Sequence, residues 1–286
     1  MRIGSQEHKE LFCHRFMATH RPYEPETLSW PDLDEGAIER LLSIPFWGEA
    51  IRIERRAGEM VSAFAATIDD PLIREAVALQ GREENRHGRL IRYMTERYNL
   101  NPAIPDPEPL PTQIEPAFVQ FGYGECIDSS FAFGLFEIGK QTGWFPDSLL
   151  SIFDTVLDEE ARHITFFVNW IAYERKRRGL AIQPIEAILT LKGYGRALLN
   201  LVKTFGNTDM GGSGFTAKGG SVFEFDLTPE KFLTICLQEN DRRMSQFDDR
   251  LLRPQLLPSL GRVALNVLKL KPGRKAPTLE TQQGAS

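Results

Sequence analysis

Apolar positions recur with helical spacing along most of the chain, and this pattern predicts long α-helices. Asp70-Pro71 is typical of a helix start, with Asp70 as the N-cap and Pro71 in the first turn. The basic run 175–178 followed by Gly179 is typical of a helix end. One short helix and four long helices are expected, over residues 35–44, 45–68, 71–98, 115–141 and 147–178.

A proline-rich segment, residues 99–114, separates the second long helix from the third. It favours an extended, polyproline-like chain that would span roughly 50 Å at about 3.1 Å per residue. A 28-residue helix is only about 42 Å long. The segment can therefore return along the whole length of a bundle, so that the third helix can run parallel to the second. The expected fold is all-α, a four-helix bundle with a long crossover between its second and third helices.

The parts of the chain outside the four long helices are less regular. Residues 1–33 contain several prolines and are expected to be irregular, and a glycine-rich loop is expected over 210–220. Further helical segments are expected over 183–205, 228–244 and 254–270. The chain is therefore divided into an N-terminal extension with a short helix, the bundle, a C-terminal helical extension and a disordered tail, over residues 1–44, 45–178, 179–271 and 272–286.

Composition narrows the class of protein. A formal net charge of −5 gives no indication of nucleic-acid binding, which usually appears as a basic patch. The three cysteines lie far apart and predict neither a disulfide framework nor a Cys-x-x-Cys metal site. No apolar run is long enough to cross a membrane, and residues 1–20 lack the apolar run of a signal peptide. The cytoplasm is the expected location, and packing of residues 256–270 against the bundle is favoured over contact with a membrane surface.

The pentad Glu-Glu-x-Arg-His occurs twice, at 83–87 in the second long helix and at 159–163 in the fourth. In each pentad a Glu-x-x-His pair places two side chains one turn apart on one helix face, where both can reach one metal ion. A lone Glu-x-x-His is a weak signal, but the full pentad is rare by chance and both faces continue with apolar residues. We therefore interpret the pentads as buried metal-binding segments rather than as charged surface helices.

A di-metal site in a bundle also needs a carboxylate from each remaining helix. On the first long helix Glu54 shares its face with small and apolar residues, whereas Glu59 lies among arginines and Glu49 is intermediate. On the third, Glu125 lies among apolar residues, where a carboxylate is costly to bury unless paired or metal-bound. Four carboxylates balance two divalent cations, and iron or manganese suits such oxygen and nitrogen ligands. The predicted ligands are Glu54, Glu84, His87, Glu125, Glu160 and His163.

An acidic residue precedes each ligand Glu of the pentads. Glu83 is expected to accept the second N–H of His163, and Glu159 that of His87, which would fix both imidazole rings. The arginine of each pentad is expected to pair with these or with neighbouring carboxylates.

Other titratable residues are assigned by position. Asp128 lies one turn after Glu125 and is either an extra ligand or a hydrogen-bond acceptor for the site. His8, His14 and His20 are expected to lie outside the helices and not to bind metal.

The order Glu, Glu-x-x-His, Glu, Glu-x-x-His, with an acidic residue before each paired Glu, resembles the ferritin-like di-iron carboxylate superfamily. Its members include bacterial multicomponent monooxygenases, ribonucleotide reductase small subunits, acyl desaturases and arylamine N-oxygenases. The resemblance covers about residues 45–178 and implies a ferritin-like bundle with two iron ions, or manganese instead. Ile91 stands where ribonucleotide reductase subunits place a radical tyrosine, with Phe167 at the matching place after His163, and Val156 stands where the N-oxygenases have an additional histidine. A stable tyrosyl radical is therefore not expected.

The resemblance implies a non-haem di-iron oxidase or oxygenase that uses O₂ to hydroxylate, desaturate or N-oxygenate a small or hydrophobic organic molecule. A separate reductase or ferredoxin would supply electrons, because the chain has no flavin or nucleotide motif. The glycine-rich loop would act as a lid over the substrate. Two alternatives remain open: an iron-handling protein, either a ferroxidase or a storage-cage subunit, and a manganese catalase. The oligomeric state is open between monomer and homodimer.

Overall fold

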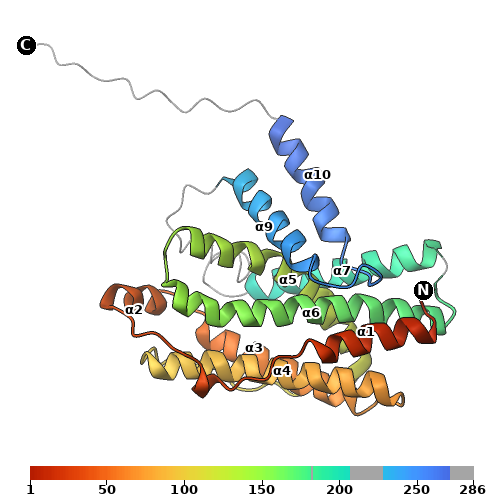
Figure 1. The fold of residues 1–286 in the computed structure, drawn as a ribbon, viewed down its shortest axis with the longest axis horizontal. Helices are drawn as coiled ribbons and strands as arrows, with labels where there is room; N and C mark the ends of the chain where they lie inside the picture. Colours follow the sequence, from red (N-terminus) through yellow and green to blue (C-terminus); the bar gives the residue numbers. More distant parts are fainter. Residues whose placement is uncertain (182, 207–227, 271–286) are drawn as a thin grey trace, which may run out of the picture.

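The computed structural model describes residues 1–181, 183–206 and 228–270, and these residues form helices and no strand (Figure 1). The fold class predicted from the pattern, all-α, is therefore confirmed. The helices are α1 Gln6–Ala18, the 3₁₀ turn η1 Pro25–Thr27, α2 Glu35–Leu42, α3 Trp47–Ala65, α4 Pro71–Arg97, α5 Ile114–Gln141, α6 Asp147–Arg177, α7 Gln183–Gly206, α9 Pro229–Met244 and α10 Leu256–Leu270.

The ends of the long helices follow the predicted chemistry. The Asp70 carboxylate accepts hydrogen bonds from the backbone N–H groups of Leu72 and Ile73 at the start of α4, and this satisfies two donors that have no partner within the helix. Gly179 follows α6 with a φ of +70°, a left-handed conformation that glycine adopts at little cost. The bounds of all predicted helices after residue 34 are confirmed to within a few residues.

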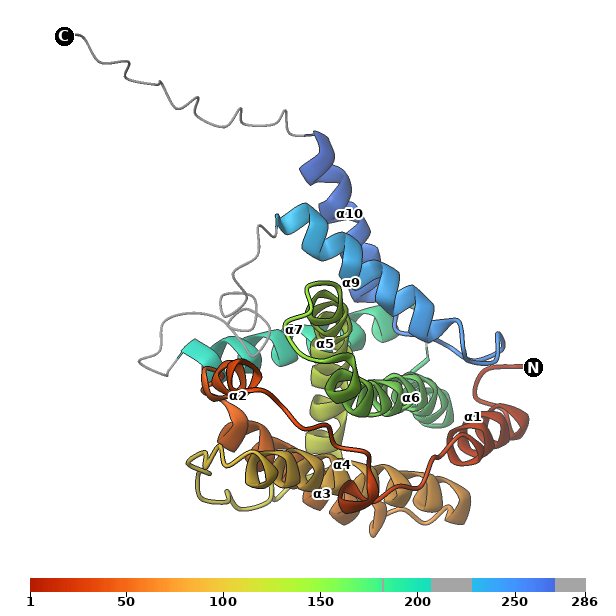
Figure 2. The same ribbon diagram turned by 60° about the vertical axis from the view of Figure 1, so that its left-hand side comes forward.

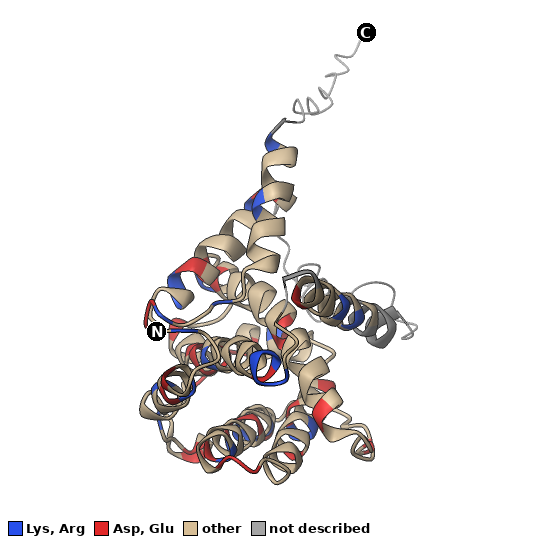
Figure 3. Cartoon of the chain, turned by 90° about the vertical axis from the view of Figure 1, so that its right-hand side faces the viewer, with Lys and Arg blue, Asp and Glu red and all other residues tan. Residues whose placement is uncertain are grey.

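Helices α3, α4, α5 and α6 surround one shared interior (Figures 1 and 2). Helix α3 packs along α4, and α5 packs along α6, so each consecutive pair forms a hairpin. The two hairpins meet where α3 contacts α5 and α4 contacts α6. Acidic and basic residues are interspersed along the described helices of the chain, as Figure 3 shows.

The connector between α4 and α5 runs back along α3. A side chain at Gly48 would collide with the carbonyl group of Ala103, so glycine permits this close approach. About two turns further along α3, the Arg56 guanidinium donates to the backbone carbonyls of Glu108 at 2.8 Å and Pro109 at 2.9 Å. The chain thereby returns to the starting end of α4, and α5 runs in the same direction as α4 (Figure 1). This agrees with the direction predicted from the length of the proline-rich segment.

The prediction that residues 1–33 are irregular is wrong, because α1 occupies Gln6–Ala18 and packs against α4 and α6. The buried face of α1 combines aromatic with polar residues. Because polar residues occupy some of the buried positions, the apolar residues alone do not show helical spacing in the sequence. His8 is fully buried, with Nε2 lying 3.0 Å from the amide oxygen of Asn169 on α6. Lys9 forms an ion pair with Asp70. His8 and His14 therefore lie within a helix, contrary to expectation.

The C-terminal helices cover the outer side of the second hairpin (Figure 2). Helix α7 packs on α5, and α9 packs on α5 and α6. Helix α10 packs mainly on α9 and only touches α5, while its Leu260, Val263 and Val267 stay exposed, so the choice between bundle packing and membrane contact for residues 256–270 stays a prediction. The buried guanidinium of Arg243 on α9 contacts Asp154 at 2.5 Å and Asp158 at 2.6 Å on α6. Among the described helices, none has the length and apolar character needed to cross a membrane. The predicted loop 210–220 and tail 272–286 lie outside the described residues.

Candidate metal centre

The structure brings five of the six predicted ligands, all except Glu125, together from three helices, and Glu125 lies beside them on a fourth. Glu54 comes from α3, Glu125 comes from α5, and each pentad supplies one Glu and one His from α4 or α6. Ligand atoms of Glu54, Glu84, His87 and Glu160 all lie within 4.8 Å of one another, and His163 adjoins the same carboxylates. The side chains of Glu84 and His87 are each 1% exposed, whereas that of Glu54 is 25% exposed. The cluster is therefore buried, with its open side at Glu54.

Two of the carboxylates span the two imidazole rings. Glu84 places one oxygen 3.6 Å from Nδ1 of His87 and the other 3.1 Å from Nδ1 of His163. Glu160 does the same, with oxygens 3.1 Å from Nδ1 of His87 and 3.4 Å from Nδ1 of His163. The ring centroids are 5.8 Å apart. Glu84 and Glu160 thus occupy bridging positions, and Glu54, 3.7 Å from Nδ1 of His87, lies at one end of the cluster.

The other nitrogen of each imidazole ring is bound by the opposite pentad, as the sequence predicted. Nε2 of His87 lies 2.8 Å from Glu159, and Nε2 of His163 lies 2.8 Å from Glu83. Because an ionised carboxylate only accepts, each Nε2 carries the proton and donates it. The Nδ1 atoms of both rings are buried without a hydrogen-bond partner, although they face the carboxylates. Two unpartnered nitrogen atoms turned toward carboxylate oxygens fit a bound cation, because a cation satisfies both kinds of lone pair.

The arginine of each pentad pairs with the acid of the other pentad, and this is the acid that holds the histidine of the arginine's own pentad. Arg86 donates to Glu159 at 2.5 Å, and Arg162 donates to Glu83 at 2.5 Å. Burial alone would raise the pKa of Glu83, but the hydrogen bond and charge of His163, together with Arg162, hold that pKa well below its usual range. Glu83 is therefore ionised at neutral pH, as an acceptor for the His163 N–H must be.

The electrostatics of the cluster favour protons or cations. Burial opposes the charged imidazolium, but the surrounding carboxylates raise the pKa of His87 and of His163 well above the usual value. Burial raises the pKa of Glu54 to about 7, although His87 opposes that shift. Four carboxylates buried together therefore need positive charge beside them. When no cation is bound, protons on the histidines and on Glu54 supply it.

Glu125 and Asp128 lie on α5 at the same end of the interior. Burial, followed by the charges of Glu160 and Glu84, raises the pKa of Glu125 well above its usual range. Burial and the charge of Glu160 raise the pKa of Asp128 to about 7. Although burial affects its carboxyl group, the Asp128 side chain as a whole is exposed to solvent. The structure therefore places Glu125 beside the cluster and Asp128 at its accessible margin.

Close packing of α3 on α4 brings Glu54 to His87. At Gly88 a side chain would begin 3.3 Å from Cβ of Glu54, and at Gly58 it would begin 2.7 Å from the backbone nitrogen of Asn85. Glycine at these positions lets the two helix backbones approach more closely than larger residues allow. The spacing between α3 and α4 therefore determines how far Glu54 lies from the predicted ligands on α4.

Sequence reasoning missed two residues that contact the acids of the pentads. Nδ1 of His20 lies 2.5 Å from Oε1 of Glu83, and the Tyr23 hydroxyl donates to Glu159 at 3.4 Å. His20, Glu83 and Glu159 form a second group of close metal-binding side chains. The two pentad arginines already balance these carboxylates, so we assign no metal ion there. That His20 does not bind metal remains a prediction. Its hydrogen bond to Glu83 was not predicted, because the sequence before residue 33 showed no helical pattern that would place His20 near the site.

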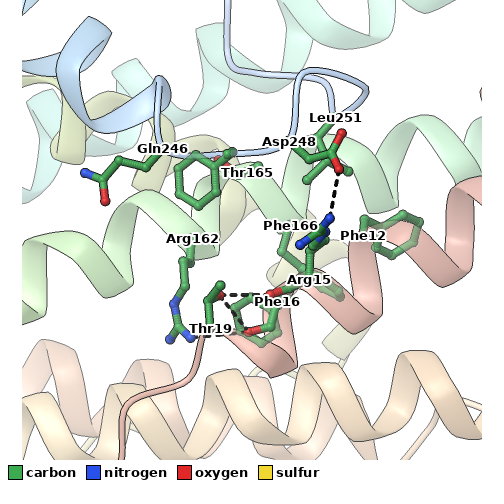
Figure 4. A pocket seen from close by; sticks show the side chains of 11 residues that line it. Phe12, Arg15, Phe16, Thr19, Arg162, Thr165, Phe166, Gln246, Asp248 and Leu251 are labelled. Atoms are coloured by element: carbon green, nitrogen blue, oxygen red, sulfur yellow. Dashed lines mark hydrogen bonds and ion pairs between the residues drawn. The ribbon is translucent and has the colours of Figure 1, made fainter.

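A cavity of about 270 Å³ lies on the other side of Arg162, between α1, α6 and residues 246–251 (Figure 4). Aromatic rings line it together with Arg15, Thr19 and Asp248, and Arg15 lies 3.3 Å from Asp248 across it. None of the six predicted ligands lines this cavity. It is therefore separate from the carboxylate cluster, with Arg162 between the two.

Comparison of the chain with protein-family models, with curated proteins and with solved structures finds no significant match in any of the three. What the structure establishes is an all-helical protein whose buried glutamate and histidine side chains can hold a metal ion.

Proposed function

We propose that this protein is a non-haem di-iron oxidoreductase on a ferritin-like four-helix bundle, which uses O₂ to oxidise an organic substrate. The observation that carries the proposal is the pair of buried Nδ1 atoms, on His87 and His163, which face shared carboxylates without hydrogen-bond partners. Both rings are locked in this orientation by Glu159 and Glu83. A merely structural histidine would use both of its nitrogen atoms in hydrogen bonds.

The ligand set divides into two halves that share two carboxylates. His87 with Glu54 would hold one ion, and His163 with Glu125 would hold the other, while Glu84 and Glu160 would contribute an oxygen to each. Four carboxylates and two neutral imidazoles cancel the charge of two divalent cations. The absence of cysteine from the cluster and the majority of oxygen ligands favour iron or manganese over zinc.

A bound iron pair supplies the redox chemistry for O₂ activation, and the protein contributes ligation, orientation and control of water. The apolar walls of the interior, which include the fully buried rings of Phe118 and Phe167, restrict water around the site. The partly exposed Glu54 and the exposed Asp128 mark the side from which a small substrate would approach. The Asp128 carboxyl group is placed to donate or accept a proton there.

Hydroxylation, desaturation and N-oxygenation all fit this proposal. A reductase or ferredoxin would deliver electrons, and the reducing cytoplasm is the proposed location. The C-terminal helices that cover α5 support a substrate enzyme over an iron store, because a store needs only the bundle.

Metal analysis of the purified chain, joined to absorption spectroscopy, tests the proposal. We expect two iron ions per chain and a transient visible absorption band when the Fe(II) form meets O₂. A chain that contains manganese and releases O₂ from peroxide would instead be a catalase. Assembly into a very large cage on size-exclusion chromatography would indicate iron storage, and a chain that binds no metal would overturn the proposal.

A further inference from the structure

The segment 16–23, at the end of α1 and just beyond it, touches the hydrogen-bond partners of both histidines. Phe16 packs its ring against His163, with centroids 5.9 Å apart, and Arg162 lies 5.1 Å above the same Phe16 ring. Arg86 lies 4.0 Å above the ring of Tyr23. One short segment outside the four ligand-bearing helices thus contacts both halves of the candidate centre.

On the His163 half, His20 completes a chain of hydrogen bonds. Its Nδ1 lies 2.5 Å from Oε1 of Glu83, while Oε2 of Glu83 accepts from Nε2 of His163 at 2.8 Å. The Glu83 side chain is fully buried and that of His20 is 26% exposed. His20 and Arg162 together hold Oε1 of Glu83, and the rotation of this carboxylate determines where its other oxygen meets His163.

On the His87 half, Tyr23 occupies the corresponding place with a weaker contact. Its hydroxyl group donates to Oε2 of Glu159 at 3.4 Å, and the same oxygen accepts from Nε2 of His87 at 2.8 Å. Arg86 holds the other oxygen of Glu159 at 2.5 Å. Glu159 therefore depends less on the N-terminal segment than Glu83 does, because a longer neutral contact is weaker than a short one to a carboxylate.

We propose that His20 is a positioning residue for the His163 half of the metal centre and that Tyr23 plays the lesser, corresponding part for the His87 half. This inference rests on the proposed di-metal function and adds residues from outside the bundle to it. The N-terminal segment would therefore contribute to metal affinity through two separate residues: His20 would act on the His163 half, and Tyr23 would act on the His87 half.

Single-half proteins provide the test. His87→Ala leaves the His163 half, and His163→Ala leaves the His87 half. Co²⁺ is titrated into each metal-free protein and followed by its visible absorption, with and without His20→Leu. Replacing a group that orients a ligand typically weakens metal binding roughly 10-fold or more. We expect His20→Leu to weaken Co²⁺ binding by this factor in the His87→Ala background and to leave the His163→Ala background unchanged.

A conservative variant separates positioning from general damage. Asparagine carries a donor where histidine has Nδ1, so His20→Asn should retain most of the affinity that His20→Leu loses. His14→Leu, at an exposed position of α1, is the matched control and should change neither half. Tyr23→Phe should weaken only the His87 half, by less than His20→Leu weakens the other.

The outcomes are distinct. Equal effects of His20→Leu on both halves, or no effect on either, would overturn the inference, as would a His20→Asn protein as weak as His20→Leu. Thermal melts followed by circular dichroism check that each variant is folded. If His20→Leu does not fold, the Co²⁺ affinity of His20→Asn, compared with that of the parent protein, tests the role of His20 instead. If the unmutated chain binds no Co²⁺, the proposed function fails, whereas binding without the half-specific effect refutes only the role of His20.

Discussion

Nε2 of His163 lies 2.8 Å from Oε2 of Glu83, so that the first residue of one pentad holds the last residue of the other. The reverse contact, between His87 and Glu159, has the same length. The repeated sequence is therefore used reciprocally: each helix supplies two of the proposed ligands and orients one proposed ligand of its partner. This accounts for the doubled glutamate in each pentad, because the two carboxylates face different neighbours.

Bridging and terminal ligands should differ in metal stoichiometry. Glu84 and Glu160 each face both histidines, so Glu84→Ala is expected to abolish binding of both ions. His87→Ala should remove one of two and leave the other. Inductively coupled plasma mass spectrometry of dialysed protein measures the difference. Glu59→Ala, on the exposed side of α3, is the control and should retain both ions. Full metal content in Glu84→Ala would contradict the assignment of the site.

Removing Glu83 should destabilise the metal-free protein strongly. Glu83→Ala leaves Arg162 and His163 buried without their acceptor, and breaking a buried pair in this way typically costs about 3–5 kcal/mol. Urea unfolding in the presence of a chelator measures the free energy of unfolding. The exposed pair of Glu59 with Arg55 offers a comparison, since Glu59→Ala should cost at most about 1 kcal/mol. Similar small losses in both variants would show that the buried network adds little to stability.

Between about pH 4.5 and about pH 7, the raised pKa of Glu54 should make the stability of the metal-free chain fall as pH rises. Burial raises the pKa of Glu54 in the folded chain to about 7, above the roughly 4.5 of an unfolded chain. Between these values the folded state binds more protons than the unfolded state, so the free energy of unfolding decreases with rising pH. The raised pKa values of His87 and His163 act in the same direction at higher pH.

The variant Glu54→Gln tests this pH dependence directly. It carries no ionisable group at position 54, so its unfolding free energy should change less across the window from about pH 4.5 to about pH 7 than that of the unmutated chain. Glu59→Gln, at an exposed position on the same helix, should leave the slope unchanged. Equal slopes in all three proteins would show that Glu54 ionises in the folded chain as freely as in the unfolded one.

Two glycines in helices should respond in opposite ways to alanine. At Gly58 the new Cβ would lie 2.7 Å from the backbone nitrogen of Asn85, so α3 must move away from α4, at a cost of about 1–3 kcal/mol. At Gly124 on α5 the new Cβ meets nothing within 4 Å, so alanine should stabilise the helix by up to about 1 kcal/mol. Thermal unfolding compares the two. Gly58→Ala should also weaken metal binding, because it moves Glu54 from His87.

The sequence alone predicted the long helices, the returning connector and the crossed contacts of the pentads, because each rests on a local signal. Apolar spacing, an Asp-Pro helix start and a repeated pentad are all readable without tertiary information. Helix α1 was missed because its buried face includes His8 and Lys9, whose partners Asn169 and Asp70 lie far away in the chain. His20 was missed for the same reason, since its hydrogen bond to Glu83 depends on where α1 ends in space.

The crossed histidine and glutamate contacts also fix how far α4 can slide along α6. A displacement by one helical turn, about 5.4 Å, would separate both pairs at once and move Glu84 and Glu160 away from one imidazole each. Apolar side chains at helical spacing tolerate such a slip far better, because neighbouring turns present similar surfaces. The repeated pentads therefore select one longitudinal alignment of the two hairpins from several that apolar packing alone would permit.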